Sequence, residues 1–528
     1  MLISVQNILG GQLSAIGGKH LEIELPLSKS ESNRALMIAY YAGIRCFDDL
    51  ETRCLGDSVS LSNSDDTVLL RKHLDTLDKY LQGLLSVDGC PLTLDCRNAG
   101  TVFRFLMTAV ANLQFTIDNN QNFENLNNSA TQQLSILLTG SERMKSRPIS
   151  SLVDALRNLG VTIEYTEKEG YPPILIGSTD HEDLRVSLSS SDTSDTRDTR
   201  RECLTGSTDY TNLRVSLSSV GTRDACDTRR ECLTGSTDHE DLRGSLSSSD
   251  TRDACDTRRL KISAEQSSQF ASSLLLAAPL WKDGLELHLT GNLSSLPYID
   301  MTINMMRQCG VDVVRNGRDI TVKPGRYNIE NIKVEPDWSA AAFWYEMVSL
   351  SDDAEVLLKN LNMNSLQADA AAIKMFENHG VETLPSKEGI VVVKKPTANS
   401  QQLTANFNFK DCPDLFPAVI AACAGNRVNA TFTGLKNLSI KESDRKRAMM
   451  NELSKINIAF EDVSDDELKM FCPDELPYFT EENPIIFNNY EDHRIAMALS
   501  ILSMKIGAIS MENLDVVAKS YPGFFKTR

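Results

Sequence analysis

The sequence predicts an α/β fold built by internal repetition. A short polar cluster followed by about three turns of apolar helix recurs six times, at residues 28–43, 98–112, 267–280, 337–350, 412–425 and 491–504. Strand-like runs lie between these segments, at residues 21–25, 161–165, 285–291, 389–395, 429–434 and 507–511. Neither G-x-G-x-x-G nor G-x-x-x-x-G-K-[ST] occurs, so a single doubly wound sheet with one nucleotide loop is not indicated. Repeated alternation of this kind predicts two similar domains.

Length and composition narrow the class of protein. The 528 residues suffice for two or three domains with cores of their own. Hydrophobic residues at 41% and charged residues at 24% are typical of a soluble globular protein. The formal charge of −18 argues against a nucleic acid or a membrane surface as partner, so any anion site must be a local one. With no signal-like start and no apolar window of about 20 residues, we expect a cytoplasmic protein.

Residues 177–259 differ from the rest of the chain. Three copies of a Ser-, Thr-, Asp- and Arg-rich segment begin at Gly177, Gly206 and Gly235, so the period is 29 residues. Each copy has few apolar anchors, which predicts a disordered insertion; a repeat solenoid and a metal site on its cysteines are the alternatives. The chain has twelve cysteines without a C-x-x-C pair, and we expect reduced, inert thiols. Without the insertion, the strand at 171–176 and the strand beginning at 260 would be joined by a short loop.

Clusters of cations stand at three predicted helix starts. The segment LPLSKSESNRAL places Lys29, Ser30 and Arg34 within a turn and a half, a donor set that suits a phosphate. A capped helix with two surface cations is the simpler alternative. In NAGTVFR, Gly100 lets backbone approach a ligand closely. The helix dipoles would favour anions there, as would the side chains of Asn98, Thr101 and Arg104, and those of Arg143, Lys145 and Arg147 in GSERMKSRPIS.

The segment SIKESDRKRAMM, residues 439–450, combines a helix start with a cluster of charges. Ser443 or Asp444 can cap the helix, and Glu442 with Lys446 has the i, i+4 spacing of a favourable pair. We expect Lys446 and Arg447 to be solvated. The remaining charges, Lys441, Glu442 and Arg445, belong either to a solvated helix start or to a ligand site.

These motifs together resemble one family. The segments LPLSKSESNRA, NAGTVFR, RMKSRPI, SSQF, SLPYIDMT, IKESDRKRAM, YEDHRIAM and AKSYPGFF occur in the order and approximate spacing of the bacterial 5-enolpyruvylshikimate-3-phosphate synthases. The resemblance runs from near the N-terminus to Lys519 and beyond, and the 29-residue repeats are its one large exception. Each motif is moderately specific, and eight in the same order are strong evidence.

The resemblance implies the enolpyruvyl transferase fold, in which two domains, each of three βαβαββ units packed as an inside-out α/β barrel, close on the substrates. The first domain is expected at 1–26 with 336–528, and the second at 27–335, interrupted by 177–259. The implied reaction transfers the enolpyruvyl group of phosphoenolpyruvate to the 5-hydroxyl of shikimate 3-phosphate and releases phosphate. It needs no metal or other cofactor. We expect these two small molecules as partners, no nucleic acid, no membrane and a monomer.

The same resemblance carries roles over to single residues. Asp414 matches the base for the 5-hydroxyl proton, Glu442 matches the proton donor, and Lys441 adjoins it as a further catalytic residue. Contacts to shikimate 3-phosphate are implied for Lys29, Ser30, Arg34, Ser267, Ser268, Ser295, Asp414, Asn437 and Lys441. Contacts to phosphoenolpyruvate are implied for Lys29, Gly100, Arg143, Gln269, Arg445, Arg494 and Lys519. Without a side chain, Gly100 also leaves room for glyphosate, which competes with phosphoenolpyruvate in sensitive members of the family.

The chemistry itself requires such a set. Two phosphates and a carboxylate enter one cleft, so several cations must offset their repulsion and hold them in reacting geometry. Addition of an alcohol to the enol ether needs a base for the hydroxyl and an acid for the methylene carbon, before phosphate is eliminated. One carboxylate must stay ionised and the other must carry a proton, so we expect their environments to differ.

Simpler roles and other functions stay open. Asp414, Ser267 and Ser268 are also suitable helix caps, and Gln269 is also a plausible surface residue. The related transferase acting on UDP-N-acetylglucosamine uses a loop cysteine and has Asn where this chain has Ser30. A non-catalytic homologue that binds a partner through the repeats is the alternative from another class. Leu27 stands where the family has a small residue, which would narrow the turn without removing its donors.

Overall fold

The structure is a computed structural model of the chain, and it describes residues 3–4, 20–44, 60–85, 90–118, 134–177, 259–263, 265, 267–293, 295–330, 332–395 and 404–525. The tandem repeat predicted at 177–259 lies outside these residues except for its two ends, Gly177 and Arg259.

Four of the described sheets share one topology. Each has four strands in which the first two are parallel and the last two form an antiparallel hairpin, inserted so that the final strand pairs with the second. The first such unit runs β3 (Leu92–Asp95), α4 (Gly100–Asp118), β4 (Ser135–Thr139), α6 (Ser150–Asn158), β5 (Ile163–Tyr165) and β6 (Ile174–Gly177), with strand order β3-β4-β6-β5. This is a βαβαββ unit, and parallel pairing requires the helical crossover between its strands.

Three further units repeat the pattern. One runs β7 (Arg259–Ser263), α8 (Ser268–Ala277), β8 (Leu285–Thr290), α9 (Leu296–Gln308), β9 (Val313–Asn316) and β10 (Asp319–Val322). Another runs β2 (His20–Ile23), α10 (Trp338–Leu350), β11 (Glu355–Lys359), α11 (Ala372–Glu377), β12 (Val381–Pro385) and β13 (Gly389–Lys394). The last runs β14 (Thr404–Asn408), α12 (Phe416–Gly425), β15 (Asn429–Thr433), α13 (Arg445–Ser454), β16 (Ala459–Ser464) and β17 (Glu467–Phe471).

A three-stranded sheet and the remaining helices complete the described fold. The sheet has the order β1 (Ile3–Ser4), β19 (Ile509–Met511) and β18 (Ile485–Phe487), and α14 (His493–Ile501) joins its two parallel strands. Further helices lie outside the units described above: α2 (Lys29–Tyr41), α3 (Asp65–Leu81), α5 (Glu142–Lys145) and η6 (Leu514–Lys519). All six helices predicted from the sequence form. No helix in the described part of the chain is long and apolar enough to cross a membrane.

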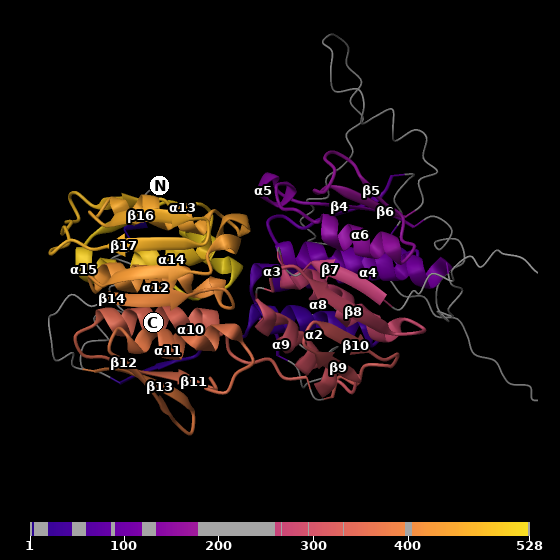
Figure 1. Ribbon diagram of the computed structural model, residues 1–528, viewed down its shortest axis with the longest axis horizontal. Coiled ribbons are helices and arrows are strands. Elements are labelled where there is room, and N and C mark those ends of the chain that lie inside the picture. The colour runs from indigo at the N-terminus through magenta and orange to yellow at the C-terminus, as the bar shows by residue number, and fades with distance from the viewer. Residues whose placement is uncertain are drawn as a thin grey trace, which may run out of the picture. The chain divides into compact units, whose positions relative to one another are not determined.

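The helices lie inside and the sheets outside. In Figure 1, α10, α12 and α14 pack against one another between the sheets that surround them, and α2, α4, α8 and α9 do the same among the sheets of β3–β6 and β7–β10. A helix enclosed in this way can be apolar on all sides. In α12, every residue from Phe416 to Gly425 is buried.

Two separate hydrophobic cores result. One contains Trp338 and Trp344 of α10 and extends to Phe524, and it includes Ile23 of β2. The other runs from Ala35 to Ile332. The chain passes between them twice, at two adjacent segments, since Leu27 pairs with Pro336 and the Ser28 amide donates to the carbonyl of Glu335 at 2.8 Å. The strands that flank the repeat belong to different sheets, β6 to one and β7 to the next.

Candidate active site

A cavity with about 890 Å³ of empty space, including its open mouth, lies where the helix starts of both cores meet. Helices α2, α4 and α8 begin at its wall, as does the turn that precedes α13. Thirteen of the residues predicted from the sequence line it: Lys29, Ser30, Arg34, Gly100, Ser267, Ser268, Gln269, Ser295, Asp414, Asn437, Lys441, Glu442 and Arg494.

Side-chain caps fix the backbone at two of these helix starts. Ser28 Oγ accepts from the amide of Glu31 at 3.4 Å, and Ser267 Oγ accepts from the amide of Gln269 at 3.2 Å. Capping orients the first helical turn, so the remaining free amides and the next side chains point to the cavity. The prediction that Ser267 is a helix cap is confirmed, and it also lines the cavity.

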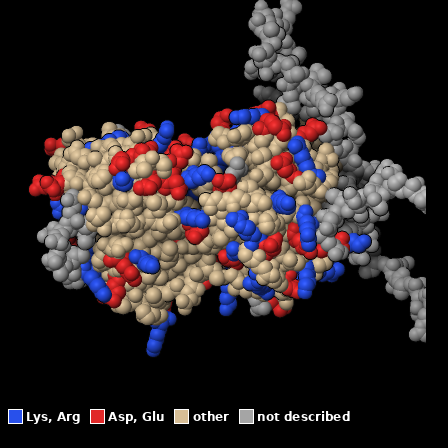
Figure 2. Space-filling model, in the orientation of Figure 1, with Lys and Arg blue, Asp and Glu red and all other residues tan. Residues whose placement is uncertain are grey.

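The cavity wall is positively charged although the chain is acidic. Six lysine and arginine side chains line it against three carboxylates, those of Asp66, Asp414 and Glu442. Figure 2 shows acidic and basic side chains interspersed over the face in view. The excess of cations is thus a local property of the cavity, which favours a ligand with several negative charges.

Two guanidiniums meet above Gly100. A Cβ atom on Gly100 would lie 2.6 Å from Nη1 of Arg104 and 2.6 Å from Nη1 of Arg147, so a larger residue would displace both guanidiniums. Arg104 donates to Gln269 Oε1 at 2.6 Å, and the Nε atoms of both arginines are buried with no hydrogen-bond partner among the described residues. Burial and the charge of Arg147 lower the pKa of Arg104 well below its usual range. Two buried guanidiniums side by side, with Nε–H groups that have no partner among the described residues, form a site that an anion would complete.

The guanidinium of Arg34 is fixed by hydrogen bonds to its neighbours in the cavity wall. Its Nε donates to Thr302 Oγ1 at 2.7 Å, and its Nη1 donates to the carbonyl of Ser30 at 2.8 Å. Its Nη2 donates to the carbonyl of Tyr298 at 3.1 Å. Burial lowers its pKa to about 10. The guanidinium therefore holds the starts of α2 and α9 together, and its positive charge contributes to the cavity from behind.

Asp414 is held by three cations. Its Oδ1 accepts a hydrogen bond from Arg445 Nη1 at 2.7 Å and lies 3.4 Å from Lys441 Nζ. Its Oδ2 accepts from Arg494 Nη2 at 3.0 Å. Burial alone would raise the pKa of Asp414, but the charges of Arg494, Lys441 and Arg445 outweigh it and hold this pKa well below its usual range. An ionised carboxylate at this position can accept a proton.

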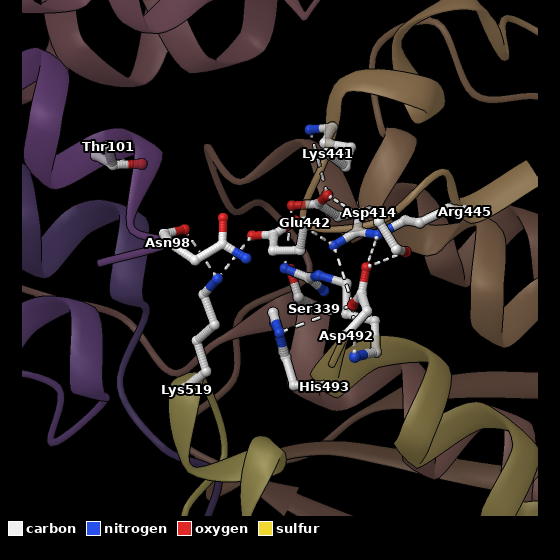
Figure 3. Close-up of polar contacts among 12 residues, drawn as sticks. Asn98, Thr101, Ser339, Asp414, Lys441, Glu442, Arg445, Asp492, His493 and Lys519 are labelled. Carbon is white, nitrogen blue, oxygen red and sulfur yellow. Dashed lines mark hydrogen bonds and ion pairs between the residues drawn. The ribbon is translucent and has the colours of Figure 1, made fainter. Parts of the chain in front are cut away.

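Glu442 and Asp414 both accept hydrogen bonds from Arg445. Arg445 Nη2 donates to Glu442 Oε2 at 2.9 Å, and Lys519 Nζ lies 3.6 Å from Glu442 Oε1 (Figure 3). Burial would raise the pKa of Glu442, but Lys519, Arg445 and other cations hold it well below its usual range. The expectation that the two carboxylates have different environments is therefore wrong for this arrangement, because the cations surround both.

Arg445 is the connection between the two carboxylates. Its Nε donates to Asp492 Oδ2 at 2.8 Å, and Asp492 in turn caps α14 by accepting from the amide of Arg494 at 3.0 Å. Arg445 is 1% exposed and does not line the cavity. Lys519 does not line it either; its side chain is 12% exposed, and its Nζ donates to the carbonyl of Asn98 at 3.1 Å. Both predicted residues thus lie behind the carboxylates.

Arg143 lies beside the cavity. The resemblance implies a contact from it to phosphoenolpyruvate, and in this structure its guanidinium donates to the carbonyl of Ser439 at 2.7 Å and to the carbonyl of Lys441 at 2.9 and 3.1 Å. It does not line the cavity, whereas Arg147, four residues later in the same motif, does. Arg143 supports the turn that carries Lys441, and Arg147 supplies the charge.

The segment from Ser439 to Met450 is partly as expected. Asp444 caps α13 by accepting from the amide of Arg447 at 3.2 Å, and the side chain of Arg447 is 80% exposed. The prediction for Lys446 is wrong: it is buried, pairs with Asp462 and donates to the carbonyl of Ser464 at 2.5 Å. Glu442 precedes the helix and pairs with Arg445 rather than Lys446.

Sequence reasoning missed several parts of the wall. Asp66, the second residue of α3, forms an ion pair of 3.3 Å with Lys29, and Tyr298 lines the cavity from α9. The sequence signal for Asp66 is the cap-like serine-aspartate start of its helix. His493, the residue before Arg494, is buried. Burial and the nearby cations Lys29 and Arg494 lower its pKa well below the usual range, so it is neutral.

No group of three or more His, Cys, Asp or Glu side chains in the described ranges is arranged to hold a metal ion. The cysteines of those ranges are free thiols, Cys90, Cys96, Cys309, Cys412, Cys423 and Cys472.

Fold and site together define an α/β protein with two cores and a cavity whose cations and two carboxylates suit multiply charged anions. Comparison with known proteins agrees: residues 71–196 and 249–527 match the model of EPSP synthase (3-phosphoshikimate 1-carboxyvinyltransferase). The chain belongs to this family.

Relatives cover nearly the whole chain. A 3-phosphoshikimate 1-carboxyvinyltransferase of Bacteroides fragilis is 30% identical and covers 97% of this chain and 95% of its own. One of Neisseria gonorrhoeae is 26% identical, with 98% and 96% covered. The solved structure of EPSP synthase from Acinetobacter baumannii superposes with a TM-score of 0.56 at 18% identity, covering 96% of this chain and 95% of that one. This last likeness shows a common fold.

Proposed function

We propose that this protein transfers the enolpyruvyl group of phosphoenolpyruvate to the 5-hydroxyl of shikimate 3-phosphate and releases phosphate, a step of aromatic amino acid biosynthesis. Family membership supports the reaction. The observation that carries it is the cavity, where six cations face three carboxylates and Asp414 is kept ionised. Such a wall offsets the charge of two phosphorylated substrates and holds a base beside them.

The two halves of the cavity wall fit the two substrates. Lys29, Ser30 and the serines at the starts of α8 and α9 offer an ammonium and hydroxyl donors, which suit the phosphate and hydroxyls of shikimate 3-phosphate. The remaining predicted contacts to this substrate are Arg34, Asp414, Asn437 and Lys441. The predicted contacts to phosphoenolpyruvate remain Lys29, Gly100, Arg143, Gln269, Arg445, Arg494 and Lys519. To these we add Arg104 and Arg147, which line the cavity beside Gly100.

In the proposed mechanism, Asp414 accepts the proton of the 5-hydroxyl as its oxygen forms a bond to C2 of phosphoenolpyruvate. Glu442 donates a proton to the methylene carbon, which gives a tetrahedral adduct. Loss of a proton from the methyl group and departure of phosphate then form the enol ether, with proton traffic reversed. Lys441 stabilises the charge that develops near Asp414, which lies 3.4 Å away.

Glu442 must be protonated to act as the acid, although the cations hold its pKa low. The incoming carboxylate and phosphate bring negative charge next to Lys519 and Arg445. These cations are then shared with the substrates, so the pKa of Glu442 rises on binding. In this proposal, substrate binding raises the pKa of Glu442 and so distinguishes it from Asp414.

Several properties of the molecule follow from the same proposal. We place the domains at 1–26 with 336–528 and at 27–335; the two hydrophobic cores and the paired crossings at Leu27 and Pro336 support this division. The repeated βαβαββ units with helices inside support an inside-out barrel of three units in each domain. We further propose a monomeric, cytoplasmic enzyme that is inhibited by glyphosate.

The test is phosphate release from phosphoenolpyruvate by the purified full-length chain. Turnover with shikimate 3-phosphate supports the proposal. Turnover with UDP-N-acetylglucosamine instead would identify the related transferase, and Ser30 in SKSES already disfavours it. Absence of turnover with both acceptors would leave a non-catalytic binding protein.

A further inference from the structure

We propose that Asp369 is a positioning residue for proton transfer at Asp414, acting through Ser339 and Arg494. Asp369 lies in η3 (Ala368–Ala371), is 2% exposed and does not line the cavity. The inference rests on the proposed role of Asp414 as the base and adds a residue to which the motifs gave no function.

The connection consists of three hydrogen bonds. The hydroxyl of Ser339, at the start of α10, donates to Asp369 Oδ2. The same hydroxyl oxygen accepts from Arg494 Nη2 at 3.2 Å, and this nitrogen also donates to Asp414 Oδ2 at 3.0 Å. Figure 3 shows Ser339, Asp414 and Asp492 around these contacts.

Counting hydrogens shows why Asp369 matters. A hydroxyl has one hydrogen to donate, whereas a terminal guanidinium nitrogen has two. Because Asp369 takes the hydrogen of Ser339, the serine oxygen presents only lone pairs to Arg494. Both hydrogens of Arg494 Nη2 are then assigned, one to Ser339 and one to Asp414. The rotation of the guanidinium and the direction of Asp414 Oδ2 are thereby fixed.

A purely structural role does not explain Asp369. The start of α10 is already fastened to this loop by Gln367, which accepts from the Trp338 amide at 3.0 Å and donates to the Pro336 carbonyl at 2.8 Å. The second carboxylate oxygen of Asp369, Oδ1, is buried with no partner among the described residues. A carboxyl group is costly to bury in this way, and packing alone would be served better by an apolar side chain. Burial and the charge of Asp414 also raise the pKa of Asp369 to about 7.

The experiment compares Asp369→Asn, Ser339→Ala, Ser339→Thr and the double variant Asp369→Asn/Ser339→Ala with the natural chain. In Asp369→Asn the amide can donate to Ser339 and turn its hydrogen toward Arg494. We expect Asp369→Asn and Ser339→Ala each to lower kcat ~10-fold with KM for both substrates within ~2-fold, because ground-state binding is untouched. The double variant should lose no more than either single one, since both remove the same connection. Ser339→Thr, which keeps the hydroxyl, should recover most of kcat.

Asp337→Asn is the matched control. Asp337 caps the same helix by accepting from the Ser339 amide at 2.8 Å but does not contact the Ser339 hydroxyl. Asparagine caps as well as aspartate, so kcat should stay within ~2-fold. A natural kcat in Ser339→Ala, or a double loss equal to the product of the single losses, would overturn the inference. Should Asp369→Asn not fold, the Ser339→Ala and Ser339→Thr pair still decides. Lack of turnover in the natural chain would refute the proposed function instead.

Discussion

Glu442 and Lys519 form an ion pair, with 3.6 Å between Oε1 and Nζ, although each comes from a different part of the chain. The same ammonium donates to the carbonyl of Asn98 at 3.1 Å, so η6 is connected to both sides of the cavity. The pKa of the proposed proton donor therefore depends on Lys519, a cation that lies beside it.

Replacing Lys519 by Met should change the pH dependence of turnover. Lys519 is the cation with the largest effect on the pKa of Glu442 after burial, and it lowers this pKa. Glu442 must be protonated to act as the acid, so kcat falls as pH rises through its pKa in the complex. Without Lys519 that pKa rises, and the falling limb of kcat moves to higher pH. Lys519→Arg keeps the charge, so its kcat should fall at the same pH as in the natural chain. If kcat falls at the same pH in the natural chain, Lys519→Met and Lys519→Arg, this account is contradicted.

Asp414→Ala should lower kcat by ~10² to ~10⁴ while shikimate 3-phosphate still binds, because a positioned base contributes that much. Steady-state kinetics and calorimetric titration measure the two effects. The control is Asp462→Ala, which removes a carboxylate that pairs with Lys446 away from the cavity. A kcat for Asp414→Ala equal to that of the natural chain would exclude Asp414 as the base.

Gly100→Ala should weaken phosphoenolpyruvate binding. The added Cβ would lie 2.6 Å from a guanidinium nitrogen of Arg104 and of Arg147, so both must move away from the ligand. We expect KM for phosphoenolpyruvate to rise ~10- to ~10²-fold and inhibition by glyphosate to weaken, with binding of shikimate 3-phosphate little changed. Gly325→Ala is the control, since its Cβ would meet nothing within 4 Å. Unchanged KM in Gly100→Ala would show that the arginines do not hold this substrate.

The sequence was sufficient to predict elements whose signals are local. Helix α8 follows a serine cap with an apolar run, and α12 is apolar throughout, so their existence and their starts were readable. The candidate site was also largely readable, because its residues stand at those starts. Repeated local patterns thus predicted the α/β class and the cationic clusters at three helix starts, while the other residues of the cavity wall came from the resemblance to the family.

Side-chain direction was not readable. Arg143 and Arg147 stand four residues apart in one motif, and only the short α5, which ends at Lys145, turns one toward the carbonyl of Lys441 and the other into the cavity. Lys446 looked like a surface charge because its partner Asp462 lies in β16, beyond the helix that carries it. Such pairings depend on tertiary contacts that a sequence pattern does not contain.

Removing residues 178–258 should leave catalysis intact. Strand β6, before the repeat, is the last strand of one βαβαββ unit, and strand β7, after it, is the first strand of the next. In the test variant, a flexible linker of ~10 Gly and Ser residues replaces the repeat. The free energy of closing a flexible loop changes by only ~0.6 kcal/mol for each doubling of its length, so the shorter connection should have little effect on stability. We expect kcat and KM within ~2-fold of the natural values, from steady-state assays on both proteins. Loss of folding would show that the repeat contributes to the structure.

Glu346→Gln should stabilise the protein increasingly as pH rises. Glu346 lies inside α10, is 0% exposed, and neither carboxyl oxygen has a partner among the described residues. Burial raises its pKa well above the usual range, so the folded chain keeps the proton. The unfolded chain loses this proton above a pH of about 4.3, so the contribution of Glu346 to stability is lost as pH rises.

Glutamine does not titrate, so the variant escapes this loss. The free energy of unfolding of Glu346→Gln minus that of the natural chain should grow by up to ~1.4 kcal/mol per pH unit above the unfolded pKa. Denaturant unfolding at several values between pH 5 and pH 8 measures the slope. Glu377→Gln, at an exposed position at the end of α11, should show no such slope. A difference for Glu346→Gln that is constant with pH would mean that Glu346 is ionised in the folded protein.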